Sequence, residues 1–274
     1  MKDIWVVKES GEKEKFDPQK VKRALRRSGL SGKEADKALK KLQPKLRDGM
    51  TTKGIYKKVY EIVRSMRPEV THRYNLKRAL QHLGPAGYDF EDFIAKLLSV
   101  QGYKTDVRQR PQGACIDHEI DVIASKGRNR YLVECKFHNE PGTRCRIQTA
   151  LYVYARFLDL KDGARLGTCG RYTNAWLVTN TKFSEDVVTY AECKEMELTG
   201  WRYPLKRSLE TMIDRTKCYP VSVIEMNYHT LRRLLSRKIV TVMDIPENPH
   251  RLADMTGIPL STARRIVEKA EYAR

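Results

Sequence analysis

Residues 118–137 read HEIDVIASKGRNRYLVECKF, and this stretch decides the fold of the larger part of the chain. Two runs rich in apolar and β-branched residues, 120–124 and 131–137, flank the polar, glycine-containing segment 126–129. Such runs on either side of a turn segment are typical of an antiparallel β-hairpin. The stretch therefore predicts two neighbouring strands at the centre of a folded domain.

Three charged side chains interrupt the apolar runs of this hairpin: Asp121, Glu134 and Lys136. With 126–129 as the loop, Asp121 lies directly opposite Glu134 at about 5 Å on the same face. Lys136 shares that face because strand side chains alternate. A loop of five residues would instead set Asp121 against Cys135. Two carboxylates this close repel each other unless a cation lies between them, and such oxygen ligands suit Mg²⁺ or Mn²⁺.

The segments around the hairpin predict a sheet covered by helices. An apolar stripe at helical spacing runs through 89–101 with Asp89 as its N-cap, and 104–109 is predicted as a strand. The elements expected after the hairpin are a helix at 144–160, a strand at 176–179 and a helix at 184–196. This order predicts an α/β fold, a mixed sheet flanked by helices.

The first 84 residues predict a separate small α+β unit. Residues 4–7 and a strand ending at Phe16 flank a turn and form a second hairpin. The helix starts carry capping signals, which are Asp17 before Pro18, Ser31 with Glu34 as a capping box, and Thr51 or Thr52. The helices expected from these signals span 18–27, 31–47, 52–66 and 69–82, and Gly84-Pro85 closes the unit.

The chain is strongly basic, and its charge is unevenly distributed. Its 274 residues contain 53 Lys and Arg against 34 Asp and Glu, a net charge of +19. Residues 1–84 hold 23 basic and 10 acidic residues, net +13, and the other 190 hold 30 and 24, net +6. Such an excess attracts polyanions, so nucleic acid or nucleotide is the expected class of partner. Lysine-rich helix faces that only meet solvent are the alternative.

Several protein classes are excluded by composition and spacing. The chain has no run of eighteen apolar residues and no signal-peptide pattern, so no membrane association and a cytoplasmic location are expected. Its six cysteines form no C-x-x-C pair and are expected to be reduced thiols. No G-x-x-x-x-G-K-[ST] sequence occurs, so a bound nucleotide is expected to be a ligand rather than fuel.

The central region resembles a known nuclease family. The resemblance rests on Gly87-Tyr88-Asp89-Phe90-Glu91, Gln101-Gly102-Tyr103, His118 to Ala124 and Val133-Glu134-Cys135-Lys136. These motifs are similar to the Mrr-type branch of the PD-(D/E)-x-K restriction-endonuclease-like superfamily over about residues 85–200. The resemblance implies that Asp121 and Glu134 are metal ligands and that Lys136 is catalytic. It also implies that Glu91 joins the metal shell and that Gln148 helps to position the site.

The N-terminal unit resembles the ATP-cone, the nucleotide-sensing module of ribonucleotide reductases and of a repressor of their genes. The matching segments are Val6-Val7-Lys8, Phe16 to Val21, Gly49 to Tyr56 and Tyr74 to Leu80. The resemblance implies a pocket for ATP or dATP in which Lys8 and Lys20 face phosphates. Thr52 would lie at a helix start whose free amides favour an anion, and Lys77 is expected to bind nucleotide with them. A basic DNA-binding helical domain is the alternative.

The last seventy residues carry a weaker pattern. Gly257-Ile258-Pro259, between apolar positions at Leu252 and Ile266, resembles half of a helix-hairpin-helix motif. Such a turn offers backbone amides to a DNA phosphate, and Pro259 removes one of these donors. DNA contact and plain helix packing both remain open. The expected domains are 1–84, 85–204 and a helical region at 205–274.

A few further residues invite a functional interpretation and a structural one. His118 and His138 flank the carboxylates, either as ligands or proton shuttles or as ordinary loop histidines. Glu119 is either a third acid of the metal shell or a partner for basic residues. Tyr152, Tyr154 and Phe157 are expected to pack in the core rather than to stack on bases. Cys135 is expected to be a small buried hydrophobe.

These patterns together predict a Mg²⁺- or Mn²⁺-dependent nuclease that hydrolyses phosphodiester bonds of DNA. ATP or dATP at the N-terminal unit would regulate it, and assembly into homo-oligomers is left open. The alternative is a non-catalytic, nucleotide-responsive DNA-binding protein built on a nuclease scaffold. The Asp121, Glu134 and Lys136 set argues against that alternative, because a scaffold without chemistry has no need for buried like charges.

Overall fold

The computed structural model describes residues 4–8, 10–84, 87–140 and 142–273. The backbone divides into two compact units, one reaching to Leu76 and the other running from Lys77 to Tyr272. Pro85, the first residue of the expected second domain, lies outside the described residues. The two units are considered separately.

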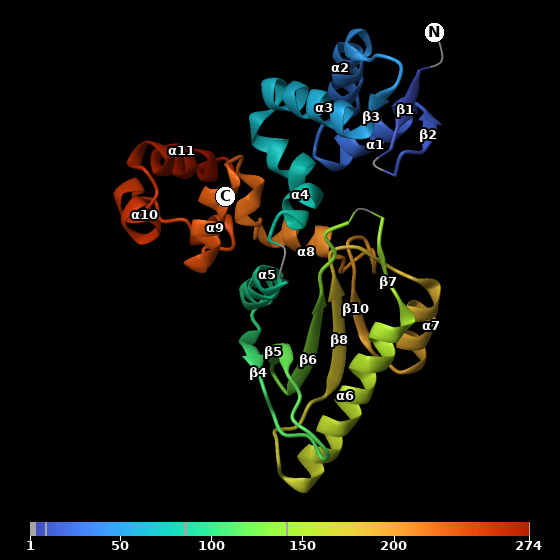
Figure 1. Ribbon diagram of the computed structural model, residues 1–274, viewed down its shortest axis with the longest axis vertical. Coiled ribbons are helices and arrows are strands. Elements are labelled where there is room, and N and C mark those ends of the chain that lie inside the picture. Colours follow the sequence, from blue (N-terminus) through green and yellow to red (C-terminus); the bar gives the residue numbers. More distant parts are fainter. Residues whose placement is uncertain (1–3, 9, 85–86, 141, 274) are drawn as a thin grey trace. The chain divides into compact units, whose positions relative to one another are not determined.

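The first unit is a small three-stranded sheet with helices (Figure 1). Strands β1 (Trp5–Val7) and β2 (Lys13–Lys15) form the expected antiparallel hairpin. A third strand, β3 (Met50–Thr51), pairs with β1 in parallel, giving the order β2-β1-β3. This strand was not expected, because two residues are too few to show an alternating pattern.

The first three helices of this unit begin where their capping residues predict, whereas the fourth begins two residues later than expected. They are α1 (Pro18–Arg27), α2 (Gly32–Leu42), α3 (Thr52–Met66) and α4 (Thr71–Gln81), which runs on into the second unit. Asp17 caps α1 and Ser31 forms the capping box of α2 with Glu34. The expectation that the second helix reaches residue 47 was wrong. It ends at Leu42 and continues as a short 3₁₀ turn that contains Pro44, whose ring cannot continue an α-helix.

The second unit is built on a mixed five-stranded sheet in the order β10-β8-β6-β5-β4. The strands are β4 (Lys104–Gln109), β5 (Ile120–Lys126), β6 (Asn129–Lys136), β8 (Asn174–Thr179) and β10 (Glu197–Thr199). Strands β4, β5 and β6 are antiparallel neighbours, whereas β8 and β10 run parallel to β6. Two short strands, β7 (Arg144–Cys145) and β9 (Lys182–Phe183), pair with each other beside this sheet.

The register of the central hairpin agrees with the sequence prediction. Ser125 pairs with Arg130 and Val122 pairs with Val133, so the next positions outward, Asp121 and Glu134, face each other. The strands run one pair further than expected and leave a two-residue turn. Gly127 is its first residue and has a φ of +61°, which glycine adopts without strain.

Helices cover the sheet, and the resulting mixed α/β fold is the predicted class. Helix α5 (Tyr88–Val100) packs against β4 and β5, and α6 (Ile147–Leu166) links the parallel strands β6 and β8 (Figure 1). The prediction that Asp89 caps the first of these helices was wrong. The helix starts at Tyr88 with Gly87 as its N-cap, two residues before the expected cap, and Asp89 lies inside the first turn.

Helix α6 begins later than expected, because Arg144 and Cys145 pair with β9 instead of joining the helix, and it also ends later, at Leu166. Its apolar side chains Val153, Phe157 and Leu160 share a core with Ile123 and Leu132 of the hairpin. This core lies on the sheet face that carries Asp121 and Glu134, since side chains two positions apart on a strand share a face. Helix α7 (Glu185–Cys193) adds Val187 to the same core.

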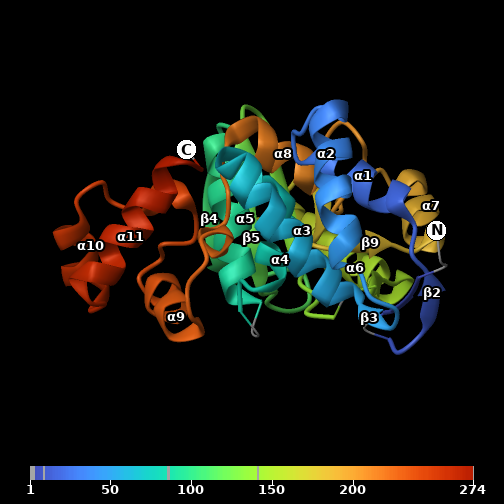
Figure 2. The same cartoon turned by 90° about the horizontal axis from the view of Figure 1, so that it is seen from above.

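The C-terminal part of the second unit consists of short helices, and the last three of them are seen together in Figure 2. The helices are α8 (Leu209–Thr216), α9 (Tyr228–Ser236), α10 (Pro249–Thr256) and α11 (Leu260–Glu271). The turn between α10 and α11 is the expected hairpin, with Gly257 in the left-handed region at a φ of +68°. Within the described residues, no helix has the length and apolar character needed to cross a membrane.

Candidate functional site

Asp121 and Glu134 form a carboxylate pair at the end of the central hairpin. The Cys135 backbone N–H donates a hydrogen bond of 2.7 Å to Asp121 Oδ2, which holds this carboxylate against the neighbouring strand. Glu134 Oε2 accepts a hydrogen bond of 2.7 Å from Arg156 Nη1. One oxygen of each carboxylate, Asp121 Oδ1 and Glu134 Oε1, accepts no hydrogen bond from the described residues.

Burial and mutual repulsion hold the protons of this pair more tightly than usual. Burial, followed by the charge of Asp121, raises the pKa of Glu134 to about 7 from an ordinary value of 4.5. The pKa of Asp121 is also raised, chiefly by burial. The charges of Arg156 and Lys136 act on both carboxyls in the opposite direction. Lys136 is exposed and ends β6, so its ammonium group is close to the pair and open to solvent.

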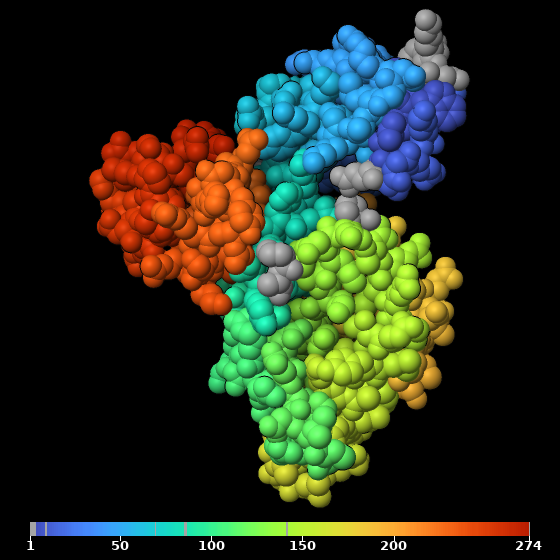
Figure 3. Space-filling view, in the orientation of Figure 1, coloured from blue at the N-terminus to red at the C-terminus, as the bar shows by residue number. Residues whose placement is uncertain are grey.

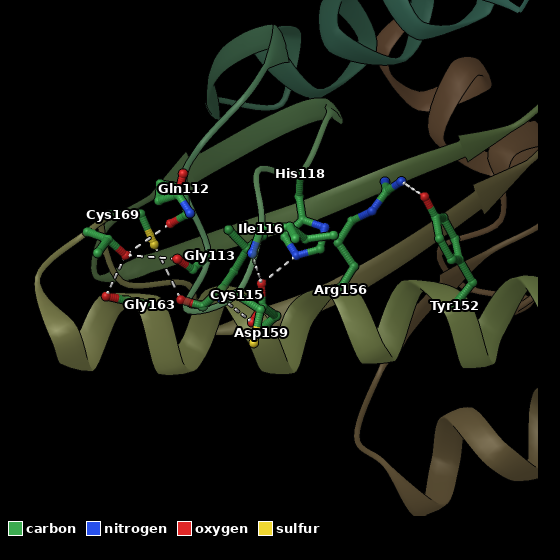
Figure 4. Close-up of polar contacts among 12 residues, drawn as sticks. Gln112, Gly113, Cys115, Ile116, His118, Tyr152, Arg156, Asp159, Gly163 and Cys169 are labelled. Carbon is green, nitrogen blue, oxygen red and sulfur yellow. Dashed lines mark hydrogen bonds and ion pairs between the residues drawn. The ribbon is translucent and has the colours of Figure 1, made fainter.

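Arg156 was not expected from the sequence, although it contacts the site directly. It lies on α6, and Nη2 donates to the Tyr152 hydroxyl one helical turn earlier (Figure 4). Its guanidinium group lies 4.4 Å from the centre of the Tyr152 ring. One sequence signal could have indicated Arg156. It is a basic residue on the apolar side of the predicted helix, four residues after Tyr152 and eight after Gln148.

Gln148 lies in the first turn of α6 and is exposed. Residues four apart on a helix share a face, so Gln148, Tyr152 and Arg156 form one row. Because Arg156 contacts Glu134, this row runs along the side of α6 that faces the carboxylates. Tyr152 is 56% exposed, so its expected core position was wrong, whereas Phe157 is buried and Tyr154 packs on the core.

Glu91 approaches the pair from α5. It is buried, and burial together with the charge of Asp121 raises its pKa to about 7. Arg108 Nη1 donates to Glu91 Oε2 over 3.1 Å, and Nη2 donates to Asp92 Oδ1 over 2.6 Å. Arg108 lies in β4 at a φ of +50°, which costs energy for a residue with a side chain. The sequence alone gave no sign of this arginine.

The donor set suits a hard divalent cation that keeps part of its water shell. Among residues 4–8, 10–84, 87–140 and 142–273, no three His, Cys, Asp or Glu side chains come together as a ready-made metal site. Asp121 and Glu134 therefore offer two carboxylates without a third protein ligand. Mg²⁺ is commonly bound by one or two carboxylates, waters and substrate phosphates, so the pair fits this ion.

The two candidate histidines differ, because His118 has a side-chain partner whereas His138 Nε2 is buried without a hydrogen-bond partner among the described residues. His118 Nε2 lies 2.7 Å from Asp159 Oδ2 on α6, and Asp159 also accepts from the Cys115 and Ile116 N–H groups (Figure 4). These bonds, with His118 first, lower the pKa of Asp159 to about 2. Burial and Lys136 lower the pKa of His138.

Cys135 and Glu119 differ in their relation to the site. Cys135 is buried, and burial raises the pKa of its thiol well above the ordinary value, as for an inert hydrophobe. Glu119 lies outside the strand and is exposed, and its negative charge contributes to raising the pKa of Asp121.

The first unit contains a cavity of about 200 Å³ between its sheet and helices. Its walls are Val6, Glu14, Phe16, Asp17, Lys20, Val21, Ala24, Thr52, Ile55, Tyr56, Val59 and Tyr74. Most of these side chains are apolar or aromatic, and Tyr56 stacks on Tyr74 at 5.1 Å between ring centres. Thr52 is the first residue of α3, so the cavity opens on a helix N-terminus.

The four residues expected to bind nucleotide are placed differently. Lys20 and Thr52 line the cavity. Lys8 lies next to the wall, since its Nζ is 3.2 Å from Glu14 Oε2, and Lys20 Nζ is 3.1 Å from the same atom. Lys77 does not line the cavity. It belongs to the second unit, where its charge is near those of Arg202 and Lys182.

The mixed sheet, the flanking helices and the carboxylate pair define the second unit as a restriction-endonuclease-like domain. The family model described as restriction endonuclease, Mrr_cat, matches residues 85–200, and the ATP cone domain model matches residues 4–83. The chain therefore belongs to the proteins in which an ATP-cone precedes an Mrr-type restriction endonuclease domain. Restriction-endonuclease-like domains usually use a divalent metal, and ATP-cones bind nucleotides.

Two similar proteins support the family assignment, and the name of neither states an activity. An uncharacterized protein of Archaeoglobus fulgidus is 34% identical over 178 residues, which are 65% of this chain and 98% of the relative. A crystal structure of AF1548, a protein of unknown function, is also 34% identical. It matches with a TM-score of 0.58 and covers 67% of this chain and 96% of its own.

Proposed function

We propose that this chain is a Mg²⁺-dependent deoxyribonuclease of the PD-(D/E)-x-K type, regulated by ATP or dATP at its N-terminal unit. The observation that carries the proposal is the register of the central hairpin, which sets Asp121 opposite Glu134 with Lys136 on the same face. Charged groups in this arrangement, at the edge of a buried core, match the needs of phosphodiester hydrolysis.

Each residue has a chemical role in the proposed reaction. Asp121 and Glu134 would hold Mg²⁺ or Mn²⁺, which when bound supplies positive charge close to the oxygens of the scissile phosphate. Lys136 orients the attacking water or stabilises the charge that develops on the phosphate. Gln148, one turn before Tyr152 on the same face of α6, helps to place the substrate. Glu91 adds a further carboxyl group, whose pKa responds to the charge of Asp121.

The nucleotide role rests on the cavity of the first unit. Its apolar walls and the Tyr56–Tyr74 stack suit a flat base, and Lys20 and the α3 N-terminus suit phosphates. Lys8 can join them if its ion pairs with Glu12 and Glu14 exchange for phosphate. The unit carries a net charge of +13 over residues 1–84, which favours an anionic ligand.

Cleavage assays with single substitutions test the nuclease proposal. Lys136→Ala and Asp121→Asn should each lower the rate of DNA cleavage in Mg²⁺ by about a hundredfold or more, since they remove charge stabilisation of the transition state. Lys126→Ala is the matched control, because Lys126 lies at the far end of the same hairpin and donates to the Gln101 carbonyl. Plasmid, single-stranded and branched DNA would serve as substrates.

Two outcomes would contradict the nuclease proposal in different ways. Cleavage that survives Lys136→Ala and Asp121→Asn would come from another site or from a contaminant. Binding of DNA by the unaltered protein without cleavage of any substrate in Mg²⁺ or Mn²⁺ would favour the second candidate, a non-catalytic DNA-binding regulator.

A further inference from the structure

Arg156 is a buried cation in direct contact with a proposed metal ligand. Only 8% of the residue is exposed, although its side chain carries a full positive charge. Arginine is rarely so buried unless it is paired, because removing a charge from water is costly. Its pairs are Glu134 through Nη1 and the Tyr152 hydroxyl through Nη2, while Nε is buried without a hydrogen-bond partner among the described residues.

The surroundings of Arg156 are strongly acidic. The charge of Asp121 raises the pKa values of both Glu91 and Glu134, and the charge of Glu91 also raises that of Glu134. Lys136 is exposed, and Arg108 is bound to Glu91 and Asp92, so Arg156 is the buried cation paired directly with the Asp121–Glu134 pair.

The position of Arg156 also limits how Glu134 can bind an ion. Because Nη1 engages Oε2, Oε1 is the Glu134 oxygen without a hydrogen bond from the described residues and the better placed to coordinate a cation, and Cys135 N–H engages one oxygen of Asp121 in the same way. The guanidinium charge would repel a divalent ion near Oε1, and this repulsion is only weakly screened because the region is partly buried. The same arginine that attracts the carboxylates therefore repels a metal ion.

We propose that Arg156 is the built-in counter-cation of the Asp121–Glu134 pair. It holds Glu134 in place beside Asp121 in the metal-free protein, and its positive charge lowers the affinity of the pair for a divalent cation. It is a positioning residue that acts through Glu134, with Tyr152 as its support. This inference rests on the proposed metal site at Asp121 and Glu134.

Direct Mn²⁺ binding tests the inference without any measurement of cleavage. Mn²⁺ would be titrated into the full chain at pH 8 without nucleic acid, and unbound Mn²⁺ would be followed by electron paramagnetic resonance. Arg156→Gln should bind Mn²⁺ about tenfold more tightly than the unaltered protein, because one positive charge near the ion is lost. Arg156→Lys should give a smaller increase of about threefold, because the shorter ammonium cannot reach Glu134 and Tyr152 together.

Controls separate this inference from the proposed function. Lys126→Ala removes a positive charge at the other end of the hairpin and should leave Mn²⁺ affinity unchanged. Asp121→Asn should abolish binding; if it binds Mn²⁺ as the unaltered protein does, the proposed metal site is wrong. If Asp121→Asn abolishes binding but both Arg156 variants bind as tightly as the unaltered protein or more weakly, the metal site stands and the counter-cation role is wrong.

Thermal unfolding supplies a second readout that a merely structural arginine would not give. In EDTA, Arg156→Gln should unfold at a lower temperature than the unaltered protein, because the carboxylates lose their counter-cation. Saturating Mn²⁺ should then raise its unfolding temperature by more than it raises that of the unaltered protein. An equal rise in both proteins would contradict the inference. If Arg156→Gln does not fold, the Mn²⁺ affinity of Arg156→Lys decides, and an affinity no higher than that of the unaltered protein overturns it.

Discussion

At the scale of single residues, Glu134 links the stability of the protein to pH. Its pKa rises from an ordinary value of 4.5 to about 7, mainly because burial disfavours its charge. Between these values the unfolded chain releases the proton while the folded chain keeps it. The free energy of unfolding of the metal-free protein should therefore fall as the pH rises through this window and change little above it through this group.

Glu134→Gln should remove this loss of stability. In EDTA at pH 8 the variant should be more stable than the unaltered protein by about 2 kcal/mol, and near pH 4 the two should agree. Urea unfolding at several pH values gives the comparison, with Glu268→Gln on the exposed face of α11 as the matched control. Parallel stability curves for Glu134→Gln and the unaltered protein would show that the charge of Glu134 carries no such cost.

The residues of the site were only partly predictable. Asp121, Glu134 and Lys136 could be found because charges stand out in apolar strands and because a period of two fixes their face. Arg156 and Arg108 could not, since one comes from a helix and the other takes a left-handed backbone conformation that no sequence pattern marks. Their roles arise from tertiary contact, and a basic side chain in isolation is most often solvent-exposed.

At the scale of elements, the capping box of α2 gives a direct prediction. Ser31 Oγ accepts from the Glu34 N–H over 3.3 Å, and Glu34 Oε2 accepts from the Ser31 N–H over 2.7 Å. Ser31→Ala should lower the free energy of unfolding of the first unit by about 1 kcal/mol, because the Glu34 N–H loses its partner. Urea unfolding followed by far-ultraviolet circular dichroism measures this, and exposed Lys37→Ala on the same helix is the control. A loss equal to that of the control would contradict it.

The helices and strands differ in how far the sequence alone predicts them. Helix starts depend on local chemistry, so Asp17, Ser31 and Thr51 marked them correctly. Strands of two residues, such as β3, β7 and β9, have no period to detect and exist only through their pairing. Residues 205–274 were expected to be helical, but the bounds of α8 to α10 were not predicted, because eight or nine residues each make too few turns for a clear apolar stripe.

At the scale of the whole molecule, the question is whether nucleotide in the first unit changes chemistry in the second. Coupling requires that ATP bind two states of the protein with different affinity, which a single sequence does not encode. Calorimetry should detect binding of ATP or dATP, and Lys20→Ala should weaken it by about tenfold through loss of a charged phosphate contact. Lys37→Ala is the control.

The rate of DNA cleavage should then depend on ATP or dATP in the unaltered protein and respond only at higher nucleotide concentration in Lys20→Ala. The rate without nucleotide serves as each protein's own reference. Absence of any heat with either nucleotide, while DNA still binds, would remove the sensory role of the first unit and favour the basic DNA-binding alternative.

The bonds from Asp159 to His118, Cys115 and Ile116 have a mechanical consequence. They anchor the segment that enters β5 to the middle of α6, three residues beyond Arg156. Strand β5 carries Asp121, and α6 carries Arg156, which donates a hydrogen bond to Glu134 on β6. Both carboxylates are thus linked to α6, Asp121 through the segment 115–118 and Glu134 through Arg156. A small shift of α6 along its axis would therefore move the two carboxylates together and preserve the distance between them.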